Sequence, residues 1–393
     1  MNMQKDVLYN FLPVGGGGGL QNALSFVSNI ETAEGRHFLI RQGSPLCAVA
    51  KQKGALVHEV SSVKGRLACE WNAGKRFADF QGVFAIFGAP FIHSHRYFIN
   101  IGGFAVSNLL YPEIDFWGYC SKLEYCRRQM VDLYRRAFYK KNDFWIFETQ
   151  TLQERAIKLF HFPEERTAVV KMAPSSLVGK DKVKSDVRAK FAAEIPQGRF
   201  TFLFLNGPHP NKRIHLLPDI AAELKKQGNN EFLFLLTMDP SHPYTREVFA
   251  KAESLQVRSF FHTVNAVKQE DVASLIDCCD AMGTLSLLES FSNNFVEAWK
   301  MGKPLIVTDS DWARQSCRES ACYVFPEQAD ASAAVFSQLM ASPALQQEMI
   351  SKGRKILSEY PTAQEKNQQY LAAIERGLAL GKLSDHDRKR IRL

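Results

Sequence analysis

Short apolar runs alternate with longer stretches of helical periodicity along most of the chain. Six such runs stand in the second half, at residues 200–205, 232–236, 257–261, 281–287, 305–307 and 322–325. Helical stretches separate them, as expected for βαβ units on a parallel sheet. The first half repeats the alternation, with strands expected at residues 7–12, 38–40, 56–57, 83–87, 97–101, 144–148 and 168–172. The pattern predicts an α/β protein.

The chain length of 393 residues suffices for two domains of ordinary size, each with its own core. We expect a first domain over residues 1–172 and a second over residues 200–360. Residues 173–199 are rich in charge, with prolines and glycines at both ends, and are expected to link the two domains. A further helix is expected within residues 361–380. The basic tail at 381–393 is expected to be disordered or to lie on the surface.

Composition narrows the class of protein. A hydrophobic content of 46% and a charged content of 23% are typical of soluble globular proteins. No apolar run reaches the roughly 18 residues that a membrane-spanning helix needs, and the first residues show no cleavable signal pattern. We therefore expect a cytoplasmic protein. The eight cysteines form no CxxC pair and no zinc-like cluster with histidine, so reduced thiols and no metal site are expected.

The net charge of +8 lies mainly in the first half. Residues 1–172 contain 21 Lys and Arg against 15 Asp and Glu, whereas the remainder contains 28 against 26. A basic first domain suggests an acidic partner, such as an anionic lipid, a pyrophosphate-bearing substrate or a nucleic acid.

A helix expected at residues 119–141 carries much of this charge. The residues expected to face inward are Leu123, Cys126, Met130, Leu133 and Ala137. The other faces carry the cations Lys122, Arg127, Arg128, Arg135, Arg136, Lys140 and Lys141, against Glu124 and Asp132. Two interpretations stay open. The helix could lie on an anionic membrane surface, where each cation is worth about 1 kcal/mol, or its basic residues could form an ordinary solvated face.

Five glycines, residues 15–19, stand between the first expected strand and a helix expected at residues 20–30. Between a strand and a helix, glycines allow the backbone to come close to a ligand because no side chain obstructs it. The alternative is a flexible linker, which fits poorly so close to a strand and a helix.

The most informative stretch of the chain is residues 284–311. A short apolar strand is expected at residues 285–288, followed by Glu289 and a polar turn, and then by a helix that carries Glu297. Asn293 or Asn294 is the expected N-cap of this helix. A strand that leads into a helix N-terminus presents free N–H groups and the positive end of a dipole, which suits a phosphate. The two glutamates could then contact opposite ends of a nucleotide-sugar.

This stretch resembles a known signature. Glu289 and Glu297, with seven residues between them, stand in an apolar-ESF-polar-EA-x3-GKP frame that is similar to the EX7E motif of retaining glycosyltransferases of family 4. The resemblance implies the GT-B fold, with two Rossmann-like domains whose parallel sheets face across a cleft, and a C-terminal helix that crosses back to the first domain. It is specific from about residue 200 to 326. The earlier residues 83–112 only loosely resemble first domains of enzymes from bacterial surface-polysaccharide clusters.

The resemblance also implies roles for single residues. Lys212, in a loop similar to the family's glycine–basic loop, would pair with the donor phosphates, with Arg213 assisting. Glu297 would take the ribose hydroxyls, and Glu289 would contact the transferred sugar and favour positive charge at its anomeric carbon. The other donor-site residues implied are Ser290, Phe291, Ser292, Thr263, Val264, Gly17 and Gly18.

The chain departs from the family pattern at two points. Pro208 or His209 stands where many members have an arginine, and the strand end that often supplies a histidine near the sugar has none. His93 and His95, one strand earlier, are the nearby substitutes. Asp309-Ser310-Asp311 looks like a manganese-binding DxD, but no metal or other cofactor is expected, because Lys212 and the helix dipole supply the positive field.

The function implied is retaining transfer of a sugar from a UDP- or GDP-sugar to a growing, lipid-linked polysaccharide such as an O-antigen, at the inner face of the cell membrane. Nucleic acid is not an expected partner. An alternative is a non-catalytic nucleotide-sugar or glycan-binding scaffold of the same fold. A nicotinamide dehydrogenase is disfavoured, because no GxGxxG stands between a strand and a helix.

Overall fold

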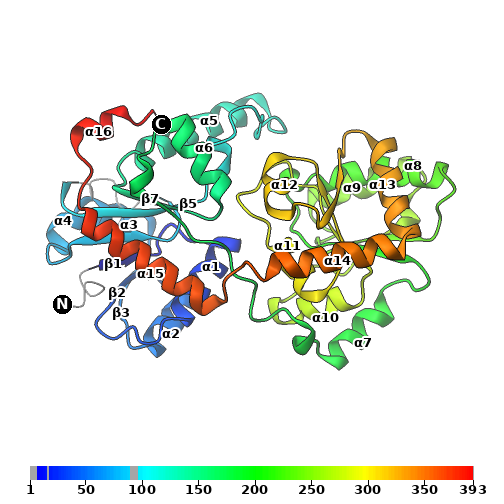
Figure 1. The fold of residues 1–393 in the computed structure, drawn as a ribbon, viewed down its shortest axis with the longest axis horizontal. Coiled ribbons are helices and arrows are strands. Elements are labelled where there is room, and N and C mark those ends of the chain that lie inside the picture. The colour runs from blue at the N-terminus through cyan, green and yellow to red at the C-terminus, as the bar shows by residue number, and fades with distance from the viewer. Residues whose placement is uncertain (1–6, 16, 89–95, 393) are drawn as a thin grey trace. The chain divides into compact units, whose positions relative to one another are not determined.

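The computed structural model describes residues 7–15, 17–88 and 96–392 (Figure 1). The chain forms two compact units. Unit 1 comprises Met1–Met172 and Pro361–Leu393, and unit 2 comprises Ala173–Tyr360. Residues 173–199, expected as a linker, lie in unit 2 and contain a helix, α7 (Ser185–Glu194).

Within the described residues, unit 1 contains a seven-stranded sheet of parallel pairs in the order β3-β2-β1-β4-β5-β6-β7. The strands are β1 (Val7–Asn10), β2 (His37–Arg41), β3 (Leu56–Val60), β4 (Gly82–Ala85), β5 (Ile99–Phe104), β6 (Phe144–Phe147) and β7 (Thr167–Val169). Its helices are α1 (Gly17–Ser28), α2 (Pro45–Gln52), α3 (Val63–Trp71), α4 (Ala73–Arg76), α5 (Lys122–Tyr139), α6 (Gln150–Phe160), α15 (Ala363–Leu380) and α16 (Asp385–Arg390).

Unit 2 contains a six-stranded parallel sheet in the order β10-β9-β8-β11-β12-β13. The strands are β8 (Phe200–Phe204), β9 (Phe232–Leu236), β10 (Phe261–Thr263), β11 (Ala281–Thr284), β12 (Leu305–Thr308) and β13 (Ala321–Val324). Besides α7, its helices are α8 (Leu217–Lys226), α9 (Pro243–Ser254), α10 (Val272–Asp277), α11 (Asn293–Met301), α12 (Asp311–Cys317), α13 (Ala329–Ala341) and α14 (Pro343–Leu357). The predicted α/β class, with two Rossmann-like parallel sheets, is confirmed.

Both sheets are buried because helices cover their faces, which is the usual condition of parallel strands. In unit 2, Phe202 of β8 and Phe234 of β9 pack against Phe336 of α13, with ring centroids 4.9 and 5.5 Å from that of Phe336. In unit 1, Tyr370 of α15 packs against Phe26 and Phe84, at 5.7 and 5.9 Å. The C-terminal helix α15 therefore completes the core of unit 1.

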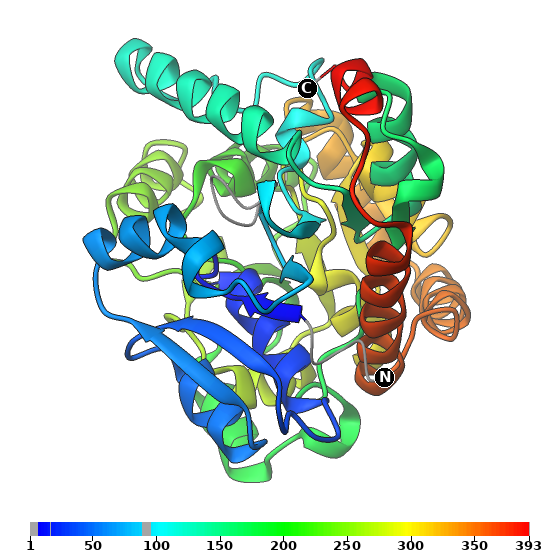
Figure 2. The same ribbon diagram turned by 90° about the vertical axis from the view of Figure 1, so that its left-hand side faces the viewer.

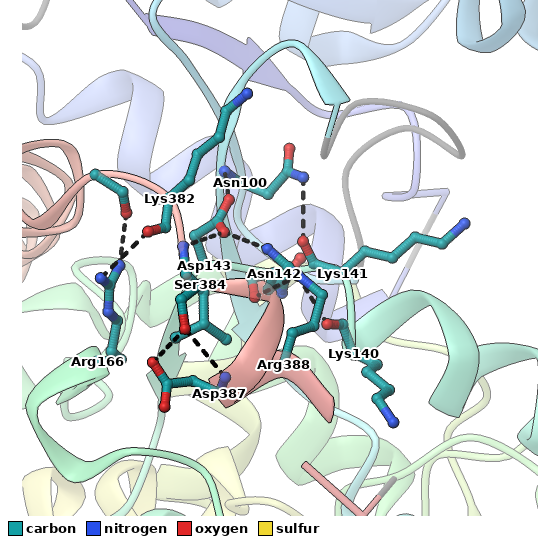
Figure 3. A network of polar contacts seen from close by, with 12 residues as sticks. Asn100, Lys140, Lys141, Asn142, Asp143, Arg166, Lys382, Ser384, Asp387 and Arg388 are labelled. Atoms are coloured by element: carbon teal, nitrogen blue, oxygen red, sulfur yellow. Dashed lines mark hydrogen bonds and ion pairs between the residues drawn. The ribbon is translucent and has the colours of Figure 1, made fainter. Parts of the chain in front are cut away.

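The tail after α15 is folded onto unit 1 rather than disordered. Arg166 donates hydrogen bonds to the carbonyls of Gly381 and Lys382, and Leu383 and Ile391 are buried. Figure 3 shows Asp143, at the start of β6, bonded to the backbone N–H of Asn100 and to the guanidinium of Arg388 in α16. The N–H of Leu383 also donates to Asp143. We call this set of contacts between Asp143 and residues 383–388 the tail latch.

Helix α5 does not have the inward face that its sequence suggested. Leu123 is 85% exposed and Met130 is 66% exposed, while the buried residues of the helix are Asp132 and Tyr139. Asp132 accepts hydrogen bonds from Trp117 and from Asn108, so polar contacts hold the helix where apolar ones were expected. Figure 2 shows α5, in teal, extending away from the rest of unit 1. Among the described residues, no helix combines the length and apolar character needed to cross a bilayer.

Candidate functional site

The strand order of unit 2 places two loops side by side. The order runs backward from β10 to β8 and then forward from β11 to β13, so β8 and β11 flank a topological switch point. In open parallel sheets, ligands bind outside the carboxyl ends of the strands at such a point. The loop after β8 carries Lys212 and the loop after β11 carries Glu289.

Hydrogen bonds between these two loops fix their positions. The side chain of Asn211 donates to the carbonyl of Leu288 at 2.9 Å, and the N–H of Leu287 donates to the carbonyl of Asn211 at 2.8 Å. Residues 285–288 therefore form this connection rather than the strand expected there, and β11 ends at Thr284. Asn211 was not singled out in the sequence, because its partners lie 77 residues away.

The contacts across the loops bring Lys212 and Glu289 together. The Nζ atom of Lys212 lies 2.8 Å from Oε1 of Glu289, and both side chains are largely but not fully shielded from solvent. The hydroxyl of Ser286 donates to the same carboxylate oxygen. Lys212 was assigned to the donor phosphates and Glu289 to the transferred sugar. In the structure the two residues form one ion pair at the switch point.

Arg213 is engaged within the protein. Its backbone adopts a left-handed conformation, with φ of 53°, which directs its side chain differently from that of Lys212. The buried guanidinium donates to the carbonyl of Leu285 at 2.8 Å and pairs with Glu327. Burial lowers its pKa from the usual arginine value. Arg213 anchors the loop, whereas the sequence had placed it beside the phosphates.

Helix α11 begins at Asn293, and its N-cap is Ser292, not Asn293 or Asn294 as expected. The side chain of Asn294 instead donates to the carbonyl of Leu205 and, at 2.9 Å, to Oγ1 of Thr284. These bonds tie the first turn of the helix to the ends of β8 and β11, because Leu205 and Thr284 lie at those ends. The first turn is thereby held at the switch point.

The turn at residues 290–292, just before α11, contains both buried and half-buried side chains. The ring of Phe291 packs against Phe295 and Tyr360, with centroids 5.8 and 5.7 Å apart, so it belongs to the core. Ser290 is half-buried and Ser292 is buried. The turn can therefore bind an anion through its backbone N–H groups, which lie next to the positive end of the α11 dipole.

Glu297 lies in the second turn of α11 and is buried. Burial raises its pKa to about 7, and a hydrogen bond from the Gln269 side chain opposes this rise only in part. Gln269 belongs to a short 3-10 helix, η9 (Gln269–Asp271), that follows β10. Glu297 therefore contacts the loop that follows β10. The sequence did not indicate this contact.

Thr263 and Val264 close the carboxyl end of β10. The hydroxyl of Thr263 donates to the carbonyl of Met238 at 2.7 Å, and the N–H of Val264 donates to the carbonyl of Leu236 at 3.1 Å. Both residues therefore have partners on the segment that ends β9. They lie at the same edge of the sheet as Lys212 and Glu289.

The DxD-like triplet is not arranged as a metal site. Asp309 forms a two-point ion pair with Arg314 of α12, at 2.5 and 2.6 Å. No group of three or more His, Cys, Asp or Glu residues suited to a metal ion occurs within residues 7–15, 17–88 and 96–392. The metal independence of the protein stays a prediction.

The remaining candidates lie in unit 1 or beyond the described chain. Gly17 and Gly18 open helix α1, so the expected glycine turn is shorter and the helix starts earlier than residue 20. A Cβ atom added at Gly18 would meet no atom within 4 Å. His93 and His95 lie outside the described residues.

Comparison with known proteins identifies the domain that holds this site. Residues 186–356 match the family "Glycosyl transferases group 1". The MMP alpha-(1->4)-mannosyltransferase of Mycolicibacterium hassiacum is 24% identical over 243 residues, which cover 56% of this chain. The match spans 58% of the length of that relative. Lys212, Glu289 and Glu297 all lie within the residues that match this family.

Solved structures share the fold over almost the whole chain. A glycosyltransferase from Rickettsia africae has a TM-score of 0.72 at 15% identity, covering 95% of this chain and 98% of its own. Anabaena Alr3699/HepE in complex with UDP and glucose has a TM-score of 0.69 at 15% identity, covering 94% and 99%. WaaG, a glycosyltransferase involved in lipopolysaccharide biosynthesis, has a TM-score of 0.66 at 15% identity, covering 93% and 98%. The fold is therefore GT-B, as the resemblance implied.

Proposed function

We propose that the protein is a retaining glycosyltransferase that moves a sugar from a UDP- or GDP-sugar to a growing, lipid-linked glycan. The observation that carries the proposal is the Lys212–Glu289 pair at the switch point of a glycosyltransferase domain. The pair lies beside the loop that leads to α11, the helix that carries Glu297. A cation, a helix N-terminus and two carboxylates are the groups that a nucleotide-sugar requires.

The donor diphosphate would bind between Lys212 and the first turn of α11. A lysine and free backbone amides at a helix N-terminus both stabilise phosphate charge. Lys212 is paired with Glu289, so donor binding would transfer its ammonium group from the carboxylate to the phosphate. Glu289 would then be free to accept hydrogen bonds from hydroxyls of the sugar. The structural neighbour HepE, which was solved with UDP, supports a nucleotide at this kind of site.

The reaction exchanges one bond at the anomeric carbon for another on the same face of the sugar. The bond from the anomeric carbon to the phosphate oxygen breaks, and the diphosphate leaves with the electron pair. The acceptor hydroxyl forms the new bond and passes its proton to the leaving phosphate oxygen. Glu289 favours the positive charge that develops on the sugar, Lys212 stabilises the leaving anion, and Glu297 holds the ribose. No metal is required in this scheme.

The acceptor side of the proposal rests on unit 1. With its C-terminal segment, unit 1 contains 28 Lys and Arg against 19 Asp and Glu, whereas unit 2 contains 21 against 22. The excess positive charge of the protein is therefore confined to unit 1. Together with the exposed apolar residues of α5, it suits an acceptor anchored in an anionic membrane, on the cytoplasmic side.

A binding scaffold of the same fold is the second candidate. The observation that favours it is that Arg213, one of the two cations expected at the phosphates, is occupied by Glu327 and Leu285. A scaffold would bind the nucleotide without turnover. An enzyme would release free UDP or GDP from one donor in a panel of nucleotide-sugars.

The test measures that release together with nucleotide affinity. Glu289→Gln is expected to reduce release at least a hundredfold without weakening nucleotide binding, because Glu289 faces the sugar and its neutralisation leaves Lys212 available to the phosphate. Glu223→Gln on α8, where the half-buried Glu223 pairs with Lys226, serves as the control and should match the wild type. Nucleotide binding without release from any donor would favour the scaffold. Equal release from wild type and Glu289→Gln would remove Glu289 from the mechanism.

A further inference from the structure

A pocket of about 350 Å³ lies at the switch point of the other sheet, within unit 1. The strand order of unit 1 reverses between β1 and β4, as that of unit 2 does between β8 and β11. The floor of the pocket is formed by residues that follow three neighbouring strands: Pro13 after β1, Phe87 and Gly88 after β4, and Ala105 and Val106 after β5. This is the place where a ligand is expected on an open parallel sheet, and the volume is in the range of small-molecule sites.

The walls of the pocket are two helices that each contribute an arginine. Arg66 of α3 donates to Glu70 at 2.8 Å, and Arg135 of α5 donates to Asp132 at 3.0 Å. Both arginine side chains remain more than a third exposed, at 37% and 38%. A guanidinium has five N–H donors, so one bond to a carboxylate leaves donors for an anionic ligand. Two guanidinium groups at one pocket suit a diphosphate better than a neutral glycan.

Apart from Glu70, which pairs with Arg66, the rest of the lining is mainly apolar and continues onto the surface. Phe138 and Tyr134 of α5 line the pocket, with ring centroids 4.2 Å apart, and Met130 follows one turn earlier on the same face. Tyr134 is 57% exposed and Met130 is 66% exposed. On α3, Trp71 is 72% exposed beside Glu70. Apolar side chains therefore continue from the pocket along α5, a helix that extends away from the rest of unit 1 (Figure 2).

We propose that this pocket binds the anionic lipid end of the acceptor, a phosphate or diphosphate ester of a prenyl chain. The phosphates lie between Arg66 and Arg135, and the first carbons of the chain lie along Phe138, Tyr134 and Met130. Charge and apolar surface are joined at one place, as they are in this class of ligand. The inference rests on the proposed function, because it assigns the acceptor's anchor to unit 1 and leaves the donor in unit 2.

The test is a calorimetric titration of the full chain with geranyl diphosphate, a short and water-soluble member of the class. We expect binding to the wild type, at least tenfold weaker binding to Arg135→Gln, and unchanged binding to Arg127→Gln. The control is matched: Arg127 and Arg135 both lie on α5, and each pairs with an acid three residues earlier, but Arg127 lies outside the pocket. Val106→Trp, which fills the pocket without changing charge, should also weaken binding at least tenfold. Inorganic pyrophosphate and geraniol, each alone, should bind more weakly than the joined molecule.

Other outcomes would overturn the assignment. Equal weakening by Arg127→Gln and Arg135→Gln would mean attraction to the basic surface and not a pocket. Binding to vesicles that contain phosphatidylglycerol distinguishes a membrane surface from a prenyl diphosphate as the ligand. Tight vesicle binding without geranyl diphosphate binding would mean that the site contacts the membrane. Weaker UDP or GDP binding by Arg135→Gln would make the pocket part of the nucleotide site. The urea transition of unit 1 shows whether each variant is folded, because all three substitutions lie in that unit. Nucleotide binding without geranyl diphosphate binding would refute this inference and leave the donor site intact.

Discussion

At the scale of single residues, the charged groups of the candidate site pair with one another. Lys212 and Glu289 satisfy each other, Asp309 is held by Arg314, and Arg213 is held by Glu327. A donor must therefore compete with Glu289 for Lys212. The exchange is feasible because the pair keeps partial access to solvent and Ser286 remains as a partner for Glu289.

Lys212→Met tests the phosphate contact. Removing a charge-assisted hydrogen bond costs about 1.5 to 3 kcal/mol, so the Kd for UDP or GDP should rise tenfold or more. Lys226→Met is the matched control, because Lys226 pairs with Glu223 on the exposed part of α8. Calorimetry measures both variants. Equal affinities of the two would separate Lys212 from the nucleotide.

Glu297→Gln tests the buried carboxyl through the pH dependence of stability. Burial raises the pKa of Glu297 to about 7, above the usual value of 4.5. Between these pH values the folded protein binds more protons than the unfolded chain, so this group lowers stability as pH rises. A glutamine side chain does not ionise, so the variant does not lose stability in this way as pH rises. Relative to the wild type, the variant should gain up to about 3 kcal/mol of stability between pH 5 and pH 8.

Urea unfolding at a series of pH values measures this difference. Glu247→Gln on the exposed part of α9 is the control. Its free energy of unfolding should differ from that of the wild type by the same amount at every pH. A constant offset for Glu297→Gln as well would mean that its carboxyl ionises in the folded protein as it does in the unfolded chain.

At the scale of elements, the sequence predicted periodic segments well and long-range polar contacts poorly. The strand at residues 305–308 and the helix with Glu297 were predicted, because both follow from local apolar patterns. The N-cap of α11 was wrong, because Asn294 bonds to Leu205 and Thr284 across the sheet. The inward face of α5 was wrong, because periodicity shows which residues share a face and not which face meets the protein.

The tail latch shows the same limit. The segment was expected to be disordered or to lie on the surface because its composition is polar and basic. The contacts that hold it were not expected, because Asp143 lies about 240 residues earlier in the chain. The carboxylate of Asp143 is fully buried, and burial raises its pKa although Arg388 opposes the rise. Such pairings between distant segments leave no local signal in a single sequence.

Arg388→Gln tests whether the latch stabilises unit 1. Removing one partner of a buried ion pair leaves the other uncompensated, so a loss of about 3 kcal/mol is expected. Arg390→Gln, also on α16 but exposed, should change stability by less than about 0.5 kcal/mol. The transition of unit 1 in urea gives both values, and nucleotide affinity should be unchanged. A loss as small as that of the control would mean that the latch adds nothing.

At the scale of the whole molecule, the two units divide the chemistry by charge. Unit 2 is close to neutral and carries the proposed donor site, whereas unit 1 carries the excess cations, the exposed apolar residues of α5 and the pocket at its own switch point. The same topology thus gives each sheet one switch point, and we propose a ligand at each. The EX7E frame allowed the proposed donor position to be predicted from the sequence. The pocket in unit 1 has no comparable motif, because its residues come from five separate elements or loops.

The most direct test of the donor site is thermal unfolding with UDP, GDP or NAD at a hundredfold excess over Kd. Binding at that excess stabilises a protein by about 2.7 kcal/mol, which raises the melting temperature of a unit of this size by about 5 to 10 °C. We expect this rise with UDP or GDP, no rise with NAD, and loss of the rise in Glu297→Ala. Melting curves that neither UDP nor GDP shifts, or an equal shift in Glu297→Ala, would contradict it.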